Sequence, residues 1–153
     1  MNMKSMSIVV AVGLIALAVF GSAYVASRGE VASPESNMPT ITLVGQTVRV
    51  TLADTEEKRA QGLSGRSGLA PDEGMLFIFQ ADGRYSFWMK DMQFSIDILW
   101  LDAEGQVVYM AQNVSPDTYP RGYRSDRDAR YVLELPSGWA ERYNVRVGDT
   151  AVL

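Results

Sequence analysis

The sequence predicts an α+β fold, a small β-rich domain with a curled, barrel-like, mostly antiparallel sheet and about two short helices. An N-terminal transmembrane or signal segment is expected to precede this domain. About 110 residues follow that segment and its linker, which is enough for one hydrophobic core. These residues form short runs, in which apolar and polar side chains alternate or all side chains are apolar. Turns that contain glycine separate the runs. Only two short stretches carry helix caps.

The chain divides into three parts. Residues 1–26 are predicted to be a signal anchor or signal peptide, residues 27–39 a flexible linker, and residues 40–153 the folded domain. Residues 8–26 are 19 consecutive uncharged residues. At about 1.5 Å per residue they span about 28 Å as a helix, close to the hydrocarbon thickness of a bilayer. The linker is polar, contains two prolines and shows no period.

The charges around the apolar run predict its orientation. Lys4 and the α-amino group precede it, whereas Arg28 beyond it is offset by Glu30. Because positive charge favours the cytoplasmic side, we expect residues 8–26 to lie in the inner membrane and the domain to lie outside the cytoplasm, in the bacterial cell envelope. A cleaved signal peptide is the alternative, and it would give a secreted protein. The sequence has no cysteine for a lipid anchor.

The domain is predicted to begin with a hairpin and a surface helix. Residues 40–52 alternate apolar and polar side chains around Gly45-Gln46, which has glycine in the first central position of a two-residue turn. Asp54 and Glu57 have the spacing of a capping box, so a helix of about two turns is expected before Gly62. The glycine-rich stretch that follows lacks the GK[ST] ending of a phosphate-binding loop, and we expect a plain loop there.

Buried strands are predicted next. Residues 75–79, 85–89 and 96–101 are short and largely apolar, which is typical of strands that are buried on both faces. A turn that ends at Gly105 leads into residues 106–111. The two segments on either side of this turn should therefore pair as an antiparallel hairpin.

The C-terminal part is expected to contain one more helix. Ser137 is a suitable N-cap, Trp139 and Tyr143 share one helical face, and Asn144 is a suitable left-handed stop. A loop is predicted over residues 112–128 and a strand over residues 131–135. The helix is predicted over residues 138–143, and a last turn and strand over residues 145–153. A loop as long as the first of these is often functional or mobile.

The composition excludes several kinds of chemistry. The chain has no histidine and no cysteine, which rules out imidazole bases, thiol nucleophiles, thiolate or imidazole zinc sites and disulfides. From Arg28 onward there are 13 Lys or Arg against 18 Asp or Glu, a net charge of −5, without a basic stripe. We therefore expect no nucleic-acid partner. We expect no cofactor and no metal site either, since the acids are scattered and form no DxDxDG calcium-binding run.

Four segments form a recognisable series, at residues 59–69, 72–79, 86–108 and 130–149. The FWMK motif with a downstream DILWLD is the most specific part of them. Together these segments resemble the DUF192 family, also called UPF0127, and the similarity covers nearly all of residues 40–153. The resemblance implies a small β-rich domain, usually exported or membrane-tethered in bacteria, without an established activity. Similar proteins often carry a cysteine pair before the RYVLEL segment, and this chain has none.

The candidate binding site is centred on an aromatic run. Phe87, Trp88 and Met89 are consecutive, and three successive strand residues cannot all face inward, so at least one should be exposed or covered by another element. An exposed ring there could stack on a sugar ring or a peptide side chain, with Lys90 and Asp97 fixing polar groups at its edge. In the long loop, the sequence also offers residues that could hold an anion or carbohydrate, above all Tyr123 and Arg124.

Asp97 is either a structural acid that the fold itself satisfies or an acid that contacts a ligand. In a strand it shares a face with Leu99 and Leu101, and a buried carboxylate must be paired, hydrogen-bonded or bound to a ligand. The partner could be Lys90, an arginine such as Arg59 or Arg66, backbone amides, or a ligand. Asp102 precedes a glycine-containing turn and is expected to cap it.

Two functions therefore compete. The first is a non-catalytic envelope module that binds a glycan, a peptide or a partner protein. The alternative is a carboxylate-dependent hydrolase or transferase acting on a carbohydrate, with Asp97 paired to Asp91 or Asp102 across roughly 5–10 Å. Ser86 and Lys90 could form a catalytic dyad, but they are not part of a known catalytic sequence motif. No catalytic residue is therefore assigned.

Overall fold

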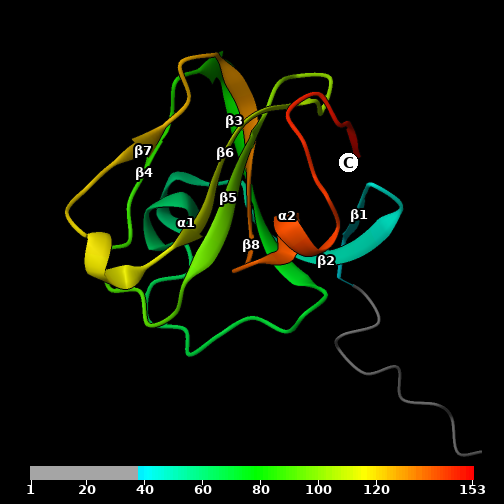
Figure 1. Ribbon diagram of the computed structural model, residues 1–153. Helices are drawn as coiled ribbons and strands as arrows, with labels where there is room; N and C mark the ends of the chain where they lie inside the picture. Colours follow the sequence, from blue (N-terminus) through cyan, green and yellow to red (C-terminus); the bar gives the residue numbers. More distant parts are fainter. Residues whose placement is uncertain (1–37) are drawn as a thin grey trace, which may run out of the picture. The chain divides into compact units, whose positions relative to one another are not determined.

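A computed structural model describes residues 38–153 (Figure 1). The predicted signal anchor or signal peptide and residues 27–37 of the predicted linker lie outside the described residues. Within residues 38–153, no helix combines the length and the apolar character that a membrane span requires.

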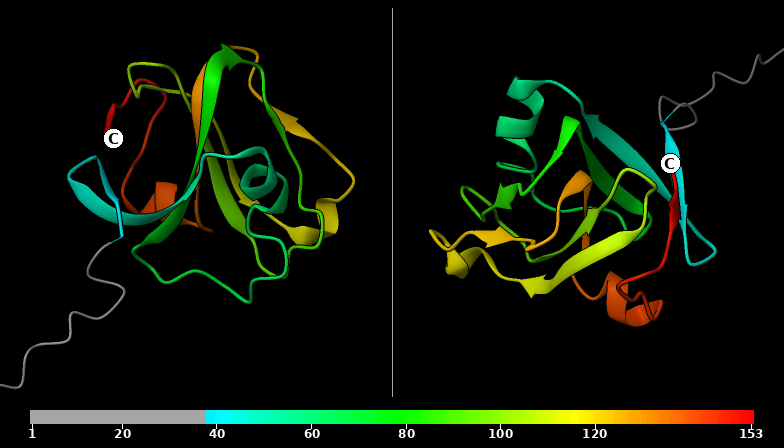
Figure 2. Two further views of the ribbon diagram at one scale, coloured as in Figure 1. Left: turned by 180° about the vertical axis from the view of Figure 1, so that it is seen from behind. Right: turned by 90° about the horizontal axis from the view of Figure 1, so that it is seen from above.

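Most strands belong to one curled sheet. Seven strands form a half-barrel in the order β6-β5-β8-β3-β2-β1-β9, and β4 pairs separately with β7 (Figure 1, Figure 2). Of the six strand pairs in the described sheet, five are antiparallel and one, β2 with β3, is parallel. The predicted β-rich, mostly antiparallel sheet with two short helices is thus confirmed. The elements are β1 (Thr40–Leu43), β2 (Gln46–Ala53), α1 (Glu56–Gln61), β3 (Glu73–Gly83), β4 (Ser86–Phe87), β5 (Ile96–Leu101), β6 (Val107–Val114), the 3₁₀ helix η2 (Pro116–Thr118), β7 (Tyr123–Arg124), β8 (Ala129–Pro136), α2 (Trp139–Arg142) and β9 (Ala151–Val152).

The first hairpin forms as expected, but its turn is displaced by one residue. Leu43 pairs with Gln46, so Val44 and Gly45 are the central residues, with φ angles of 46° and 77°. Two positive φ angles match the turn type that follows the right-handed twist of paired strands. The predicted turn at Gly45-Gln46 is therefore wrong, because Val44 takes a left-handed conformation that β-branched residues rarely adopt.

α1 covers the predicted residues, although Thr55 rather than Asp54 caps it. The Thr55 hydroxyl accepts a hydrogen bond from the Lys58 backbone N–H at 3.3 Å. Asp54 instead pairs with the Lys58 ammonium group at 2.7 Å. The helix ends at Gly62, which has a φ of 50°. The predicted end of the helix is confirmed. The predicted capping box is wrong, because the N-cap is Thr55 and the residue three positions after it is Lys58 rather than a Glu or Gln.

Two expectations about the middle of the chain are wrong. The strand predicted over residues 85–89 is only the two-residue β4, because the chain leaves the strand conformation after Phe87. The loop predicted over residues 112–128 contains the end of β6, the helix η2 and β7. β6 continues because Val114 still pairs with Ile96 of β5, and β7 forms because it pairs with β4.

α2 lacks the predicted cap. Ser137 donates its hydroxyl to the Asn113 side-chain oxygen at 2.7 Å. Gly138 occupies the N-cap position with a φ of 79°. As a glycine, it has no side chain that could accept a hydrogen bond from the helix. The predicted contact between Trp139 and Tyr143 is confirmed, since their ring centroids lie 4.7 Å apart.

The two faces of the sheet bury separate apolar clusters. One cluster includes Leu99, Leu101, Leu133, Leu135 and Trp139. The other includes Phe77, Met89, Ile98, Trp100 and Val132. Because strand side chains alternate between faces, Asp97 lies on the first face and Glu134 on the second. Each face thus contains one buried acid.

Candidate functional site

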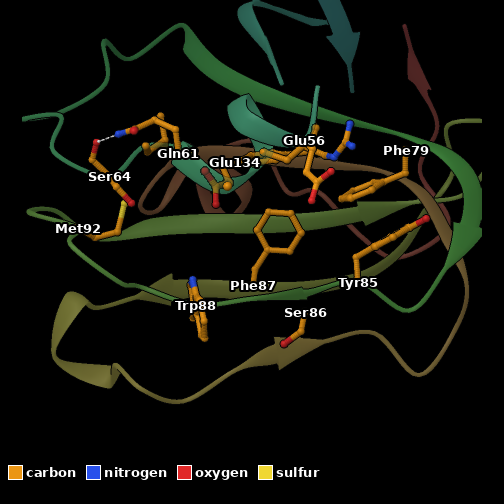
Figure 3. Close-up of a pocket in the computed structure, with 15 residues that line it drawn as sticks. Glu56, Gln61, Ser64, Phe79, Tyr85, Ser86, Phe87, Trp88, Met92 and Glu134 are labelled. Atoms are coloured by element: carbon orange, nitrogen blue, oxygen red, sulfur yellow. Dashed lines mark hydrogen bonds between the residues drawn. The ribbon is translucent and has the colours of Figure 1, made fainter. Parts of the chain in front are cut away.

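A pocket of about 310 Å³ lies between α1 and β4, on the face of the sheet that contains Glu134 (Figure 3). Residues of α1 and the turn after it form one wall, the segment around β4 forms the opposite wall, and residues of β3 and β8 complete it. The lining residues are Glu56, Arg59, Ala60, Gln61, Gly62, Leu63, Ser64, Phe77, Phe79, Tyr85, Ser86, Phe87, Trp88, Met92 and Glu134.

The aromatic residues of the pocket are held by one another. The Phe87 ring meets Phe77 edge-on, with centroids 4.8 Å apart, and meets the buried Trp100 edge-on at 5.8 Å. Phe79 stacks on Tyr85 with centroids 3.5 Å apart and nearly parallel planes. Edge-on and stacked contacts stabilise ring positions beyond simple burial. The aromatic wall is therefore preformed.

Trp88 is the exposed member of the aromatic run. It lines the pocket and retains 59% of its surface accessible, whereas Met89 beside it is buried. Its ring meets Tyr119 edge-on at 6.1 Å. The expectation that one of three successive residues would be exposed is confirmed, and the exposed residue is the largest of the three.

The α1 wall supplies a fixed cation. The Arg59 Nη1 donates to the backbone oxygens of Asp54 at 2.9 Å and Ile78 at 3.0 Å. Its guanidinium lies 5.3 Å from the centroid of the Phe79 ring. These contacts tie α1 and the segment that precedes it to β3, so Arg59 acts mainly as a brace for the pocket wall.

Glu134 is the least expected group in the pocket. Only 5% of its surface is accessible, and its Oε2 atom has no hydrogen-bond partner in the structure. None of the ion pairs within residues 38–153 includes it. Burial alone raises the pKa of its carboxyl group from the usual 4.5 to about 8, because an apolar environment disfavours the charged form.

The sequence contains a signal that could have identified Glu134. In the predicted strand over residues 131–135, Glu134 alternates with Leu133 and Leu135 and shares a face with Val132. An acid on an apolar strand face is the same signal that Asp97 gives.

Asp97 lies on the opposite face of the sheet and does not line the pocket. It is 0% exposed. Its Oδ1 accepts from the backbone N–H groups of Asn113 at 2.8 Å and Gly138 at 3.2 Å, and its Oδ2 accepts from Ala140 N–H at 2.8 Å. Asp97 therefore supplies the missing cap of α2. Of the partners considered from the sequence, the backbone amides are the ones that satisfy it.

The other predicted site residues are divided between the pocket and its surroundings. Phe87 and Trp88 line the pocket, whereas Lys90, Tyr123 and Arg124 do not. The Lys90 carbonyl accepts a hydrogen bond from the Ser64 hydroxyl at 2.9 Å, and its side chain is exposed. Tyr123 and Arg124 form β7 and pair with Phe87 and Ser86. They support the β4 wall from behind.

The carboxylate pairs considered from the sequence do not meet at the pocket. Asp91 is exposed, and the Asp102 Oδ1 accepts from the backbone N–H groups of Glu104 and Gln106, as expected of a turn cap. The carboxylates that line the pocket are Glu56 and Glu134. Within residues 38–153, no group of three or more acidic side chains is placed to hold a metal ion.

Two solved structures share this fold. One is a protein from Sinorhizobium meliloti 1021, described as a proposed transcription regulator, with a TM-score of 0.70, 32% identity, and 74% of this chain and 91% of that chain covered. The other is a protein of unknown function from Novosphingobium aromaticivorans DSM 12444, with a TM-score of 0.72, 27% identity, and 78% and 89% of the two chains covered.

Archaeal proteins are similar in sequence. A UPF0127 protein of Thermococcus gammatolerans is 33% identical over 102 residues, which are 65% of this chain and 63% of the relative. A UPF0127 protein of Pyrococcus abyssi is 33% identical over 103 residues, which are 66% of this chain and 82% of the relative. The match thus spans less than two thirds of the length of the first relative.

The family assignment agrees with the resemblance noted in the sequence. Residues 39–153 match DUF192, a family described as "Uncharacterized ACR". The match covers every described strand and helix, and no activity is established for the family. On this basis the chain belongs to the DUF192 (UPF0127) family.

Proposed function

We propose that this domain is a non-catalytic binding module of the cell envelope and that its pocket takes up one sugar residue of a glycan. The observation that carries the proposal is the exposed indole of Trp88 at a pocket that combines aromatic rings with polar groups. Placement in the envelope rests on the apolar run at residues 8–26.

The pocket chemistry supports a sugar as the ligand. Sugar rings have apolar faces that stack on aromatic side chains and hydroxyl groups at their edges that need hydrogen-bond partners. Trp88 and Phe87 offer the first kind of surface. On the opposite wall, the Gln61 amide and the Ser64 hydroxyl already donate to the Ser64 and Lys90 carbonyls, and their side-chain oxygens can accept from sugar hydroxyl groups. A volume of about 310 Å³ is at the small end for ligand pockets, which favours one ring over an extended segment.

Charge argues against a nucleic-acid ligand. The solved relative from Sinorhizobium meliloti is described as a proposed transcription regulator. Residues 38–153 of this chain contain 12 Lys or Arg and 16 Asp or Glu, a net charge of −4. Proteins that bind DNA use basic patches to neutralise phosphates, so we do not extend that description to this chain.

Tryptophan fluorescence can test the proposal directly. Trp100 and Trp139 are 0% and 5% exposed, so quenching by acrylamide should report mainly on Trp88. The full chain in detergent micelles would be titrated with fragments of cell-wall glycans and polysaccharides. We expect a bound fragment to protect Trp88 from quenching and to bind at least about tenfold less tightly to Trp88→Ala, measured by calorimetry.

A matched control makes this test specific. Val147 is an exposed apolar residue that does not line the pocket, so Val147→Ala should bind like the wild type. Equal retention of every glycan by wild type and Trp88→Ala would reject the proposal. Protection by peptides but not by glycans would also reject it, because the pocket would then serve a different ligand.

A carboxylate-dependent hydrolase or transferase is the second candidate, and one observation favours it. Glu56 and Glu134 both point into the pocket (Figure 3), and burial raises the pKa of Glu134 to about 8. Two carboxyl groups in such different environments are typical of an acid and base pair. Turnover of aryl glycosides that is lost in both Glu56→Gln and Glu134→Gln but kept in Glu141→Gln would support this function, and absence of turnover in the wild type would reject it.

A further inference from the structure

We propose that the pocket is selective for a ligand that carries a protonated amino group, which pairs with the Glu134 carboxylate. The inference deepens the proposed function and rests on it, since it names the ligand as an amino sugar rather than a neutral sugar. It is carried by a buried, unpartnered acid that lines a pocket with aromatic walls.

Asp97 is a buried acid with a structural role, and the fold satisfies it with backbone donors. Three backbone N–H groups donate to the Asp97 carboxylate, at 2.8, 3.2 and 2.8 Å. Glu134 is on the adjacent strand and is nearly as buried, yet its Oε2 has no hydrogen-bond partner within residues 38–153. Buried polar groups without partners are rare and costly. The missing donor is therefore expected to come from a bound ligand.

Among residues 38–153, no group around Glu134 takes the place that the ligand would occupy. Its cross-strand partners are Met75 on β3 and Ile98 on β5, which are both apolar. The charged groups that face the pocket from α1 are Glu56 and Arg59. Arg59 donates to two backbone oxygens and forms no ion pair with Glu134.

From the β4 segment, the side chains that face Glu134 across the pocket are Tyr85, Ser86, Phe87, Trp88 and Met92, and none of them is charged at neutral pH. Figure 3 shows the Glu134 carboxyl group directed toward the pocket that these residues close. Since no side chain within residues 38–153 pairs with this carboxyl group, a strong interaction would have to come from a group that enters the pocket.

The aromatic walls favour a cation over a neutral donor. A ring face attracts an ammonium group electrostatically, and aromatic residues that surround an acid form the usual cage for such groups. Phe87 is fixed by two edge-on contacts, and Trp88 is accessible. Glu56 and Arg59 also line the pocket and carry opposite charges, but the Arg59 guanidinium already contacts two backbone oxygens and the Phe79 ring. An ammonium group would therefore meet aromatic rings and, once Glu134 has lost its proton, a carboxylate that has no other cation beside it in the described part of the chain.

Binding should release a proton. Below about pH 8 the carboxyl group of free Glu134 is mostly protonated, since burial raises its pKa to about 8. When R–NH₃⁺ enters, the proton leaves Glu134 for the solvent and the pair becomes COO⁻ with R–NH₃⁺, so charge and protons balance. Affinity should therefore rise about tenfold per pH unit between about pH 6 and pH 7.5 and level off near the pKa.

The test uses matched ligand pairs on the full chain in detergent micelles. Calorimetry would compare glucosamine with glucose and cyclohexylamine with cyclohexanol, each in two buffers of different ionisation enthalpy. We expect each amine to bind at least about tenfold more tightly than its hydroxyl partner and to release close to one proton per molecule bound. Cyclohexylamine stays protonated across the range, so it serves for the pH series.

Two variants identify the group responsible. Glu134→Gln preserves shape and removes the acid, so it should abolish both the amine preference and the proton release. Glu141→Gln, on the exposed surface of α2, should change neither. Equal affinity for amine and hydroxyl ligands, or an amine preference that survives in Glu134→Gln, would overturn the inference. The folded state of each variant is checked by its thermal unfolding curve.

The outcomes separate this inference from the proposed function. If glucose and glucosamine bind equally and depend on Trp88, the glycan-binding function stands and the amine inference fails. If cyclohexylamine binds through Glu134 but neither sugar binds, the glycan-binding function and the amino-sugar assignment both fail, and only the pairing of Glu134 with a protonated amine is supported. If no ligand of either pair binds, both fail.

Discussion

Asp97 and Glu134 lie on neighbouring strands, one residue apart in register, and their carboxyl groups point to opposite faces of the same sheet. Asp97 is opposite Leu135, and Glu134 is opposite Ile98. Asp97 accepts three backbone hydrogen bonds, whereas no group within residues 38–153 donates to the Glu134 Oε2. The fold therefore satisfies the first acid. The second is buried without a partner, which costs stability.

Stability should depend on pH through Glu134. The unfolded chain loses this proton near the usual pKa of 4.5, while the folded state keeps it up to about pH 8. In that window the folded state binds more protons, so the free energy of unfolding falls as pH rises, by at most about 1.4 kcal/mol per pH unit. Urea unfolding of wild type and Glu134→Gln at several pH values should show this slope in the wild type only. Parallel pH profiles would contradict the prediction.

Asp97→Asn should destabilise the domain strongly without changing ligand preference. Asparagine has only one side-chain oxygen that can accept a hydrogen bond. Its NH₂ group would replace the other carboxylate oxygen and would face a backbone N–H, so two donors would oppose each other. Unsatisfied buried groups and lost charge-assisted hydrogen bonds suggest a cost of about 3 kcal/mol or more in urea unfolding. Asp126→Asn, at an exposed loop position, is the control and should cost little. A loss of amine preference in folded Asp97→Asn would mean that Asp97 contributes to the site.

The two tryptophans near Phe87 should behave differently when truncated. Trp88 is 59% exposed and Trp100 is 0% exposed. We expect Trp88→Ala to cost less than about 1 kcal/mol of stability and Trp100→Ala to cost about 3–5 kcal/mol, because it leaves a cavity in the core. Thermal and urea unfolding would measure both. A large loss of stability in Trp88→Ala would show that the ring is needed for folding and weaken its assignment to binding.

Gly74→Ala should disturb the β3 and β8 pair. A Cβ atom at Gly74 would lie 2.8 Å from the Glu134 backbone oxygen and 3.1 Å from a Leu135 methyl group. Since these atoms are held in a strand, we expect a loss of about 1–3 kcal/mol in urea unfolding. Gly68 has no atom within 4 Å of such a Cβ, so Gly68→Ala is the matched control. Equal stability of the two variants would contradict the prediction.

Local sequence signals predicted most of the fold correctly. β5 begins and ends at the predicted residues, Gly62 ends α1, and Asn144 takes the left-handed conformation expected of a helix stop. These features depend on side chains within a few positions of one another. The misplaced elements depended on distant partners, as for β7, which forms because β4 passes beside it.

The site could be predicted only in part, for the same reason. The sequence predicts an exposed residue near Phe87 and Trp88 because three successive strand residues cannot all face inward. Asp97 and Glu134 give the same signal in the sequence, an acid on an apolar strand face. Which of them is satisfied depends on donors at Asn113 and beyond residue 137, and no local pattern shows that these amides converge on Asp97.

The pairing of β1 with β9 has a practical consequence. Leu43 is opposite Ala151, so the first and last strands of the domain lie side by side (Figure 2). A domain whose two ends are adjacent can be inserted into a surface loop of a host protein without forcing that loop apart. Residues 40–153 are thus suited to transplantation, and the pocket, which neither end strand lines, could be carried intact on a soluble carrier and used as a capture reagent.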